Sequence, residues 1–333
     1  MKLPSFAAAL LALALAAPAG AVTTLKIATL APDGSGWMRE MRAGAQAVKD
    51  RTQGRVEVKY FPGGVQGNSD AVLRKMRLGQ LQGGAFSSSE IGPVVADAQI
   101  YSLPFQFNSQ AELDAVRPQI DPKVRAAFEA KGLVLAGIAG GGFTYLMSTR
   151  PIRNRDDLRA GKVWFPQGDL IAQVTFETGG VQPIPLPLAD VYTALSTGMV
   201  DTVGNTVSGA IAFQWHTRIK YVVDLPLTYV LGMLILDERP VDKLAAEDRA
   251  ALLDELDKAF LRIDANNRKD NEAARSALAR QGIAIEVPPA AERETWLAIG
   301  VEARRKLAER NAYSTSLESE IEALLVPARG GSD

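Results

Sequence analysis

The side chains that most often carry catalysis are scarce in this sequence of 333 residues. Cysteine is absent and His216 is the only histidine, so a Ser–His–Asp hydrolase would have to use His216 as its base. His216 lies in the segment FQWHTR (213–218), and the sequence contains no G-x-S-x-G nucleophile motif. We therefore expect no catalytic residues, and an exported hydrolase that uses His216 stays open as an alternative.

Metal and phosphate sites are equally unsupported. One histidine, no cysteine and scattered carboxylates do not give zinc-binding spacing, and no calcium loop of the D-x-D-x-D-G type is present. The glycine-rich segments PGGVQGN (62–68) and AGGGFT (139–144) match neither the dinucleotide-binding nor the P-loop motif. These glycines are expected to form turns, or to let backbone amides approach a bound molecule. We expect no metal and no cofactor.

Aromatic and hydroxyl side chains at predicted strand ends or in loops are better candidates, and the chemistry they offer is ligand binding. Trp164 lies in GKVWFPQGD (161–169), where Pro166 stops strand pairing and Gly168 permits a sharp turn. Strand ends are where α/β proteins commonly hold ligands. For each aromatic residue taken alone, packing in a core or between domains is an equally good interpretation. The further candidates are Trp37, Phe143, Trp215, Ser87 and Ser88.

Strand and helix patterns that could position these residues alternate along the chain. Helices are expected at 36–52 and 170–178, and the predicted strands are 25–32, 55–61, 84–86, 132–139 and 161–165. Such alternation is typical of an α/β fold with a mainly parallel sheet and helical crossovers.

A long helix is predicted over 245–281, which contains neither glycine nor proline. Leu252, Leu256, Phe260 and Ile263 recur at helical spacing. A helix of this length runs about 55 Å, whereas a domain of about 100 residues is about 30 Å across. We therefore expect the helix to span two domains. A coiled-coil partner is the alternative, although the apolar stripe is not a sustained heptad.

The first 21 residues are typical of a secretory signal peptide. Lys2 precedes an apolar run (7–17) and a small-residue site ending at Ala21. This run is shorter than the roughly 20 residues that span a membrane, although an uncleaved anchor is the alternative. Without Lys2, the chain has 37 − 1 = 36 basic and 38 acidic residues, a net charge of −2. We expect a periplasmic protein, cleaved after Ala21, with no nucleic-acid partner.

Four segments occur in the order typical of one family. They are LKIATLAPDGSGW (25–37), the stretch 54–82, RPIRNRDDLRAGKVWFPQGD (150–169) and PIPLPLADVYTALSTGMVDTVGN (183–205). In these segments the chain resembles the extracytoplasmic solute-binding proteins of TRAP (tripartite ATP-independent periplasmic) transporters. The resemblance implies two α/β lobes joined by hinge strands, a long helix spanning both, and a ligand held between lobes that close around it.

The resemblance also implies partners. Family members deliver a small-molecule ligand, mostly an organic acid, to a TRAP membrane permease driven by an ion gradient. A sensor or scaffold that binds an accessory periplasmic protein is the remaining alternative. On this basis the expected parts of the chain are lobe I at 22–145 plus about 225–260, lobe II at 146–224 plus about 261–326, and a flexible tail at 327–333.

The sequence departs from the family at two positions that usually hold the ligand carboxylate. Trp164 stands where an arginine pairs with the carboxylate, and Thr144 stands where a second arginine is common, whereas Asn205 matches the expected asparagine. Tryptophan offers an apolar face and one N–H; arginine offers a charge and several donors. We expect a ligand more apolar, aromatic or cationic than a C4-dicarboxylate, unless Arg74 or Arg150 takes over the pairing with a ligand carboxylate.

Overall fold

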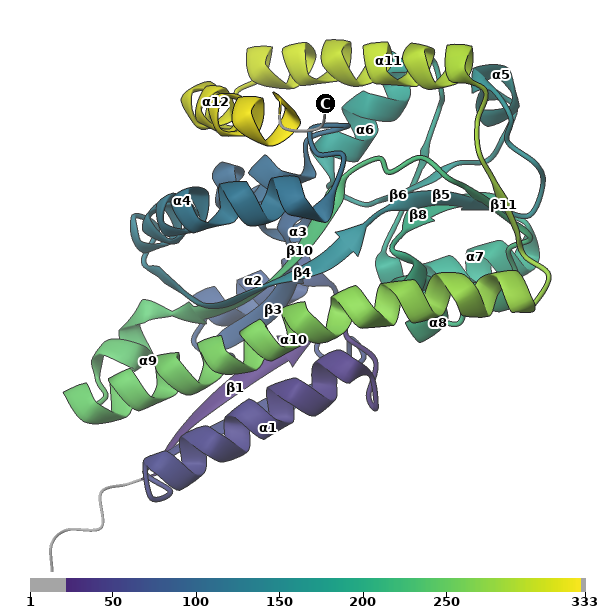
Figure 1. Ribbon diagram of the computed structural model, residues 1–333. Coiled ribbons are helices and arrows are strands. Elements are labelled where there is room, and N and C mark those ends of the chain that lie inside the picture. The colour runs from purple at the N-terminus through teal and green to yellow at the C-terminus, as the bar shows by residue number, and fades with distance from the viewer. Residues whose placement is uncertain (1–21, 331–333) are drawn as a thin grey trace, which may run out of the picture.

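The computed structural model describes residues 22–330, which form two α/β lobes lying side by side (Figure 1). The first lobe is built on a five-stranded sheet of order β2-β1-β3-β10-β4, and the second on a four-stranded sheet of order β11-β9-β5-β8. A separate pair of strands, β6 and β7, belongs to the second lobe. The predicted two-lobe α/β fold is confirmed. The predicted signal peptide, residues 1–21, lies outside the described residues.

The strand directions follow from the way the chain passes between the lobes. β1 pairs in parallel with β2 and β3, but β10 runs antiparallel to β3 and β4, and β5 runs antiparallel to β8 and β9. The expectation of mainly parallel sheets is therefore wrong, because β10 carries the chain back into the first lobe. The first sheet comprises β1 (Thr23–Thr29), β2 (Val56–Phe61), β3 (Gly83–Ser87), β4 (Leu133–Phe143) and β10 (Tyr229–Asp237). The strands of the second lobe are β5 (Tyr145–Ser148), β6 (Trp164–Pro166), β7 (Ile184–Leu186), β8 (Thr202–Asn205), β9 (Tyr221–Val223) and β11 (Ala284–Glu286).

Helices cover both sheets, and several begin at a side-chain cap of a residue type that favours this position. Ser35 accepts a hydrogen bond from the backbone N–H of Met38, and Asp169 accepts one from Ala172. The first-lobe helices are α1 (Gly36–Arg51), α2 (Ser69–Arg77), α3 (Ser88–Ile91), α4 (Gln110–Glu129) and α9 (Glu238–Asp242), with a 3₁₀ turn η1 at Ala96–Ser102. The others are α5 (Arg155–Arg159), α6 (Leu170–Thr178), α7 (Val191–Thr197), α8 (Val207–Ala212), α10 (Ala246–Arg280), α11 (Ala290–Glu309) and α12 (Thr315–Gly330), with 3₁₀ turns η2 at Leu188–Asp190 and η3 at Trp215–Thr217.

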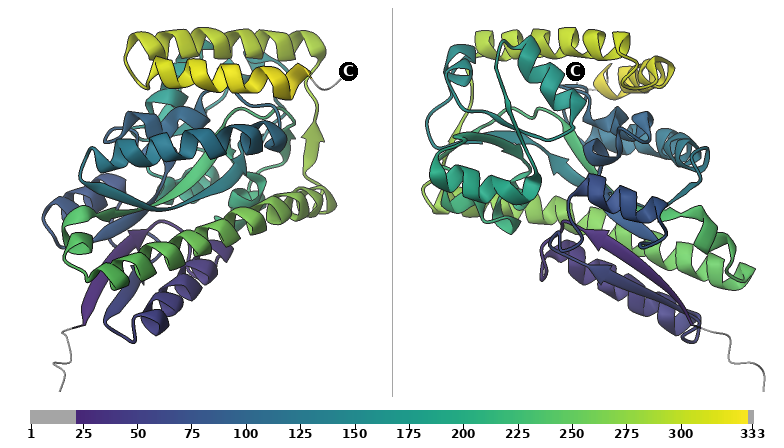
Figure 2. Two further views of the ribbon diagram at one scale, coloured as in Figure 1. Left: turned by 60° about the vertical axis from the view of Figure 1, so that its left-hand side comes forward. Right: turned by 180° about the vertical axis from the view of Figure 1, so that it is seen from behind.

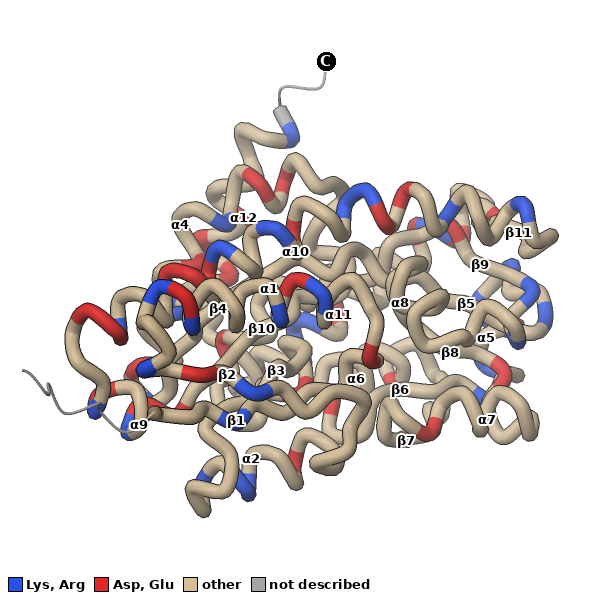
Figure 3. The backbone as a smooth tube through the Cα atoms, turned by 90° about the horizontal axis from the view of Figure 1, so that it is seen from below, with Lys and Arg blue, Asp and Glu red and all other residues tan. Residues whose placement is uncertain are grey.

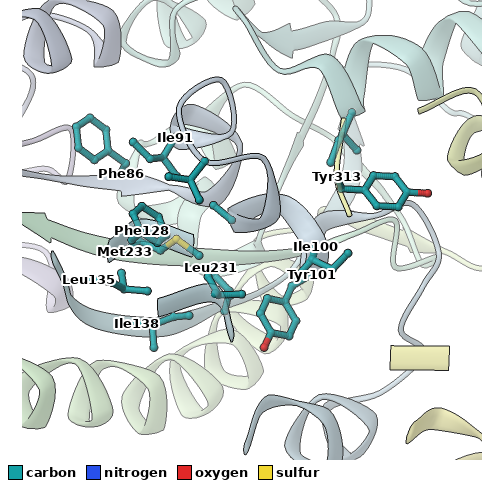
Figure 4. Close-up of a cluster of buried hydrophobic side chains, with 14 of the residues drawn as sticks. Phe86, Ile91, Ile100, Tyr101, Phe128, Leu135, Ile138, Leu231, Met233 and Tyr313 are labelled. Atoms are coloured by element: carbon teal, nitrogen blue, oxygen red, sulfur yellow. The ribbon is translucent and has the colours of Figure 1, made fainter. Parts of the chain in front are cut away.

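The first sheet has a hydrophobic core on each face. One core packs α1 and α10 against strands β1, β4 and β10. The other joins β3, β4 and β10 to α2, α3, η1, α4 and α12, and Figure 4 shows part of it, from Phe86 and Ile91 to Tyr101 and Tyr313. Burial of a single large apolar side chain contributes about 1.5–3 kcal/mol. With no cysteine in the chain, these cores must hold the lobe together without disulfides.

The helix α10 crosses from one lobe to the other, as Figure 2 shows from two further directions. Its 35 residues correspond to about 52 Å. Leu256 and Phe260 belong to a core of the first lobe, whereas Ala274 and Leu278 belong to a core of the second. The prediction of a long helix spanning both lobes is confirmed, and the stripe of apolar residues packs within this chain.

The helix α12 returns to the first lobe. Leu317, Ile321 and Leu325 are buried in the same core as α4, whereas Trp296 on α11 is buried in a core of the second lobe. We accordingly propose that α12 be counted with the first lobe, in contrast to the expected boundary at about 261–326. The helix includes residues 327–330, which the sequence interpretation assigned to a flexible tail.

Charges of both signs are mixed along the chain in Figure 3, as the formal net charge of −1 for the whole sequence implies. Within residues 22–330, none of the helices combines the length and the apolar character that a membrane span requires.

Candidate functional site

A cavity of about 1260 Å³ lies between the two lobes. The first lobe contributes the ends of β1 and β3 and the start of α1, and the second lobe contributes β6, the start of α6 and the end of β8. Strand ends therefore meet at the cavity from both sides, as expected for a ligand site in α/β proteins. Six of the predicted site residues line it: Trp37, Ser87, Ser88, Thr144, Trp164 and Asn205.

Thr144 lies in the hinge at one edge of this cavity. Its backbone N–H donates to Thr228 O at 2.9 Å, and its carbonyl accepts from Leu227 N at 2.9 Å. The hydroxyls of Thr144 and Thr228 are 2.8 Å apart and share a hydrogen bond. The two segments that connect the lobes are thus joined to each other at Thr144, so its hydroxyl is already engaged.

Trp164 lines the cavity but exposes little surface to it. The residue is 2% exposed and belongs to a core of the second lobe. Its Nε1–H donates to the carbonyl of Leu186 at 3.0 Å, across the pairing of β6 with β7. The single donor of the indole is therefore satisfied within the protein, and Trp164 presents only an apolar edge to the cavity.

The other predicted aromatic residues divide between the cavity wall and the cores. Trp37 lines the cavity and packs edge-on against Phe260 on α10, with centroids 5.9 Å apart. Phe143 and Trp215 are not among the lining residues. Phe143 stands edge-on to Tyr229 at 5.1 Å, and Trp215 is 1% exposed behind Trp164. For Phe143 and Trp215, contact with a ligand stays a prediction, to which the packing lends no support.

The serine segment after β3 is organised by a carboxylate. Ser87 caps α3, and its hydroxyl lies 2.9 Å from Glu90 Oε2, which also accepts from Ser87 N at 2.7 Å. Ser69 donates its hydroxyl proton to the other oxygen of Glu90. Ser88 is buried, and its hydroxyl bonds to Ser102 at 2.8 Å. Of the two predicted serines, Ser87 is the more accessible from the cavity, because Ser88 is 1% exposed.

Asn205 ends β8 at the cavity, opposite Tyr145 of β5. Its Oδ1 accepts from the backbone N–H of Thr206 at 2.8 Å, which orients the amide. Among the described residues, its Nδ2 has no hydrogen-bond partner, so it is a donor available to a ligand.

The cavity wall carries more carboxylates than arginines. The acidic lining residues are Asp33, Asp70, Glu90, Asp169, Asp190 and Asp270, and the arginines are Arg39, Arg155 and Arg280. Neither Arg74 nor Arg150 is among them, and Arg150 instead pairs with Asp201 at 3.3 Å. The hypothesis that Arg74 or Arg150 pairs with a ligand carboxylate in place of Trp164 or Thr144 is therefore not supported.

Asp169 brings a carboxylate of the second lobe close to the first. Desolvation raises the pKa of Asp169, and the negative charge of Glu90 acts in the same direction. Hydrogen bonds from Ala172 N and from the Ser89 hydroxyl oppose this rise. Ser89 belongs to α3 of the first lobe and, like Asp169, lines the cavity between the lobes.

The glycines of β4 allow α10 to lie close to the hinge. A Cβ on Gly140 would stand 2.0 Å from the Tyr229 hydroxyl oxygen. Gly140 N donates to Asp264 Oδ1 at 2.7 Å, and Gly140 O accepts from Asn267 Nδ2 at 2.7 Å. Asn271 continues this row one helical turn later, bonding Gly141 O at 2.8 Å and Ser208 of the second lobe. The glycine-rich segment thus serves close helix packing, and Gly141 also lines the cavity.

His216 lies away from this cavity. The one contact of its ring nitrogens among the described residues is 3.4 Å, from Nδ1 to the carbonyl of Ala210, and no serine hydroxyl bonds to it there. Residues 22–330 also contain no group of three histidine, cysteine, aspartate or glutamate side chains placed to hold a metal ion. The hydrolase hypothesis gains no support from this geometry.

Many of the lining residues were not predicted from the sequence, among them Arg155, Trp296 and Asn267. Asn267 did leave a signal, because it follows Ile263 by four residues and so occupies the apolar stripe of the long helix. Arg155 and Trp296 left none, since they are 141 residues apart (296 − 155) and meet only in the folded chain.

Two α/β lobes joined by hinge strands around a shared cavity define a solute-binding protein of the periplasmic type. Residues 27–311 match the family model DctP, described as bacterial extracellular solute-binding protein, family 7. The chain belongs to this family, which confirms the predicted resemblance to TRAP solute-binding proteins.

The chain is similar to several curated family members. It is 31% identical over 163 residues to a solute-binding protein of Chromohalobacter salexigens, a match that spans 48%, or about half, of each chain. It is 24% identical over 267 residues to the C4-dicarboxylate-binding periplasmic protein DctP of Rhodobacter capsulatus, covering 79% of this chain and 80% of that protein. These relatives are named as binding proteins and not as enzymes.

Solved structures share the fold. A TRAP periplasmic solute-binding protein of Roseobacter denitrificans with bound β-D-glucuronate superimposes with a TM-score of 0.84 at 22% identity, covering 90% of this chain and 99% of that one. One of Ralstonia eutropha H16 with bound (S)-2-acetolactate gives the same TM-score and identity, covering 91% and 99%.

Proposed function

We propose that this protein is a periplasmic receptor that captures a small organic molecule between its lobes and delivers it to a TRAP-type membrane permease. The observation that carries the proposal is the cavity, because both lobes and the hinge contribute to its wall. A ligand that contacts both lobes stabilises the arrangement in which they are closed. The proposal includes cleavage of the signal peptide after Ala21 and no catalytic activity.

For the ligand, we propose a molecule more apolar or aromatic than a C4-dicarboxylate. The support comes from the two positions where the family usually carries arginine. Trp164 has no free donor, and Thr144 is engaged with Thr228. A second carboxylate on the ligand would also approach Glu90 and Asp169, and like charges repel.

Within the cavity, we propose distinct roles for the lining residues. Trp37 and the edge of Trp164 supply apolar wall, and Asn205 orients a polar end of the ligand through its free Nδ2. Ser87 offers hydroxyl lone pairs at the opposite wall. These contacts come from both lobes, as closure requires.

The proposal is tested first by native mass spectrometry of the freshly purified mature protein, followed by a thermal-shift screen of small molecules. We expect a bound organic molecule, and an apparent stabilisation of about 2.7 kcal/mol when the ligand is present at a hundredfold excess over its dissociation constant. Small-angle scattering should then show a more compact protein with ligand bound.

Asn205→Ala should weaken binding about tenfold. Asn266→Ala, on the exposed face of α10, is the matched control.

Other outcomes would favour the alternatives. Turnover of an ester or amide that is abolished by His216→Ala would indicate a hydrolase. Ligand binding without ligand-dependent transport by a reconstituted permease, together with capture of an accessory periplasmic protein, would indicate a sensor or scaffold. Binding of C4-dicarboxylates in preference to every apolar compound in the screen would contradict the proposed ligand class.

A further inference from the structure

The cavity between the lobes continues into the second lobe, between α5, α6 and α11. We call this part the inner chamber, lined by Arg155, Leu158, Phe176, Val181, Trp296 and Ile299. Leu158, Val181 and Trp296 belong to one hydrophobic core, against which Phe176 packs. The wall of the inner chamber is therefore mainly apolar and includes two aromatic side chains.

Trp296, one of the lining residues, carries a donor without a partner. The residue is 5% exposed, and its indole Nε1–H is buried without a hydrogen-bond partner in the described chain. A buried donor without a partner costs free energy, so native proteins rarely leave one. Trp164 in the main part of the cavity differs, because its Nε1–H is bonded to Leu186 O at 3.0 Å.

Arg155 brings a free positive charge to the same wall. Its side chain is half-buried, and within residues 22–330 its guanidinium makes no hydrogen bond or ion pair. The other two lining arginines, Arg39 and Arg280, are exposed. A guanidinium that is partly desolvated and unpaired favours an anionic partner.

Arg155 and Trp296 are held near each other. The backbone N–H of Arg155 donates to Glu292 Oε2 at 3.2 Å, and Glu292 precedes Trp296 by one turn on the same side of α11. Glu292 accepts this hydrogen bond from the backbone of Arg155, and within residues 22–330 it forms no ion pair with the guanidinium. Glu292 therefore does not neutralise the charge of Arg155. Its own negative charge does weaken the attraction between Arg155 and an anionic ligand.

We propose that the inner chamber binds the carboxylate of an aromatic monocarboxylate, with Arg155 and Trp296 Nε1–H as its donors and Phe176 and Leu158 against its apolar part. Both unsatisfied groups are donors, and a carboxylate is an acceptor that satisfies both. A ligand so anchored reaches the lobe interface past Leu227 and Phe105, which line the cavity beside the hinge. The inference deepens the proposed function and rests on it.

The test is calorimetric titration of the full mature protein with 3-phenylpropanoate and with its neutral counterpart, 3-phenylpropanamide. We expect the acid to bind at least tenfold more tightly than the amide, because only the acid carries a negative charge that can pair with the guanidinium of Arg155. This comparison uses the wild-type protein, so it does not depend on any variant folding correctly.

Variants then locate the donors. Arg155→Gln should weaken binding of 3-phenylpropanoate about tenfold or more, and Trp296→Phe, which keeps an aromatic ring and removes the N–H, should weaken it several-fold. Arg153→Gln changes an exposed arginine close to Arg155 that does not line the cavity, and it should leave the affinity unchanged. Thermal unfolding of each variant checks that it folds.

Equal affinity for the acid and the amide, no binding of 3-phenylpropanoate to the wild-type protein, or unchanged affinity in Arg155→Gln would each overturn the inner-chamber site. These results are distinguishable from failure of the proposed function. If the thermal-shift screen finds another ligand that makes the protein more compact, the receptor proposal stands without the inner-chamber site; if no compound binds, the receptor proposal fails as well.

Discussion

The indole of Trp164 stands edge-on to that of Trp215, with ring centroids 5.4 Å apart and planes inclined by 81°. Edge-to-face pairs of this kind add stability beyond the burial of area. Together with the hydrogen bond to Leu186, this contact makes Trp164 a support of the cavity wall. Trp164 thus contributes packing behind the wall and places no charge in the cavity.

Trp164→Phe should destabilise the protein by about 2–3 kcal/mol. The change removes the hydrogen bond to Leu186 O and leaves space against Trp215. Trp164→Arg should cost more, because it buries a guanidinium among apolar side chains. Urea unfolding measures both, with Trp37→Phe at the half-buried cavity wall as the milder control. Equal stabilities for Trp164→Phe and wild type would contradict the supporting role.

Gly140→Ala should destabilise the protein by about 2–3 kcal/mol. A Cβ at this position would overlap the Tyr229 hydroxyl at 2.0 Å and press on Asp264 Oδ1 at 3.0 Å. The matched control is Gly204→Ala in β8, where a Cβ would meet nothing within 4 Å. That variant should be unchanged or up to about 1 kcal/mol more stable, since alanine restricts the unfolded chain. Similar losses in the two variants would rule out the close-packing explanation.

Asp169→Asn should make stability depend less on pH above about pH 4. Desolvation raises the pKa of Asp169 in the folded protein above the unfolded value of about 3.9. The folded state therefore binds the proton more strongly, and the contribution of Asp169 is favourable below about pH 4 and is lost as the pH rises through the folded pKa. Asparagine keeps the cap of α6. Urea unfolding at a series of pH values should show the free energy of unfolding of the variant rising relative to that of the wild type as the pH increases. A difference in free energy of unfolding that does not change with pH would contradict this prediction.

Asp248→Asn should show the opposite pH dependence. Hydrogen bonds from Arg55 lower the pKa of Asp248, through Nε to Oδ2 at 3.0 Å and Nη2 to Oδ1 at 2.8 Å. Because the folded pKa lies below the unfolded value of about 3.9, the stabilisation is present above about pH 4 and is lost as the pH falls through the folded pKa. The variant should be less stable than the wild type at neutral pH and approach it in acid. A difference that persists in acid would mean that the effect is not ionic.

Ile321→Ala should destabilise the protein by about 2–4 kcal/mol. Ile321 is fully buried where α12 packs against α4 of the first lobe. Val326→Ala changes a residue of the same helix that is 69% exposed, and it should alter stability by no more than about 0.5 kcal/mol. Urea unfolding of both variants tests the docking of α12. A loss confined to the unfolding of the second lobe would instead favour the boundary expected from the sequence.

Several features of this protein could be predicted from local sequence because their physical causes are local. The helical spacing of Leu252, Leu256 and Phe260 requires no knowledge of the partner surface, and α10 does span the lobes as predicted. The order of the four family segments likewise identified the two-lobe fold and the family. Ser87 and Asn205, which end β3 and β8, do meet at the cavity with Trp37 at the start of α1.

Only the tertiary structure decided which side chains are free to bind. The sequence could not show that Trp164 already donates to Leu186 O, or that Trp215 stands behind it, because these partners are separated by 22 residues (186 − 164) and 51 residues (215 − 164). The same holds for Arg155 and Trp296, whose shared wall depends on the docking of α11. Residue types determine what a side chain can donate or accept, and long-range packing decides whether that capacity is already used.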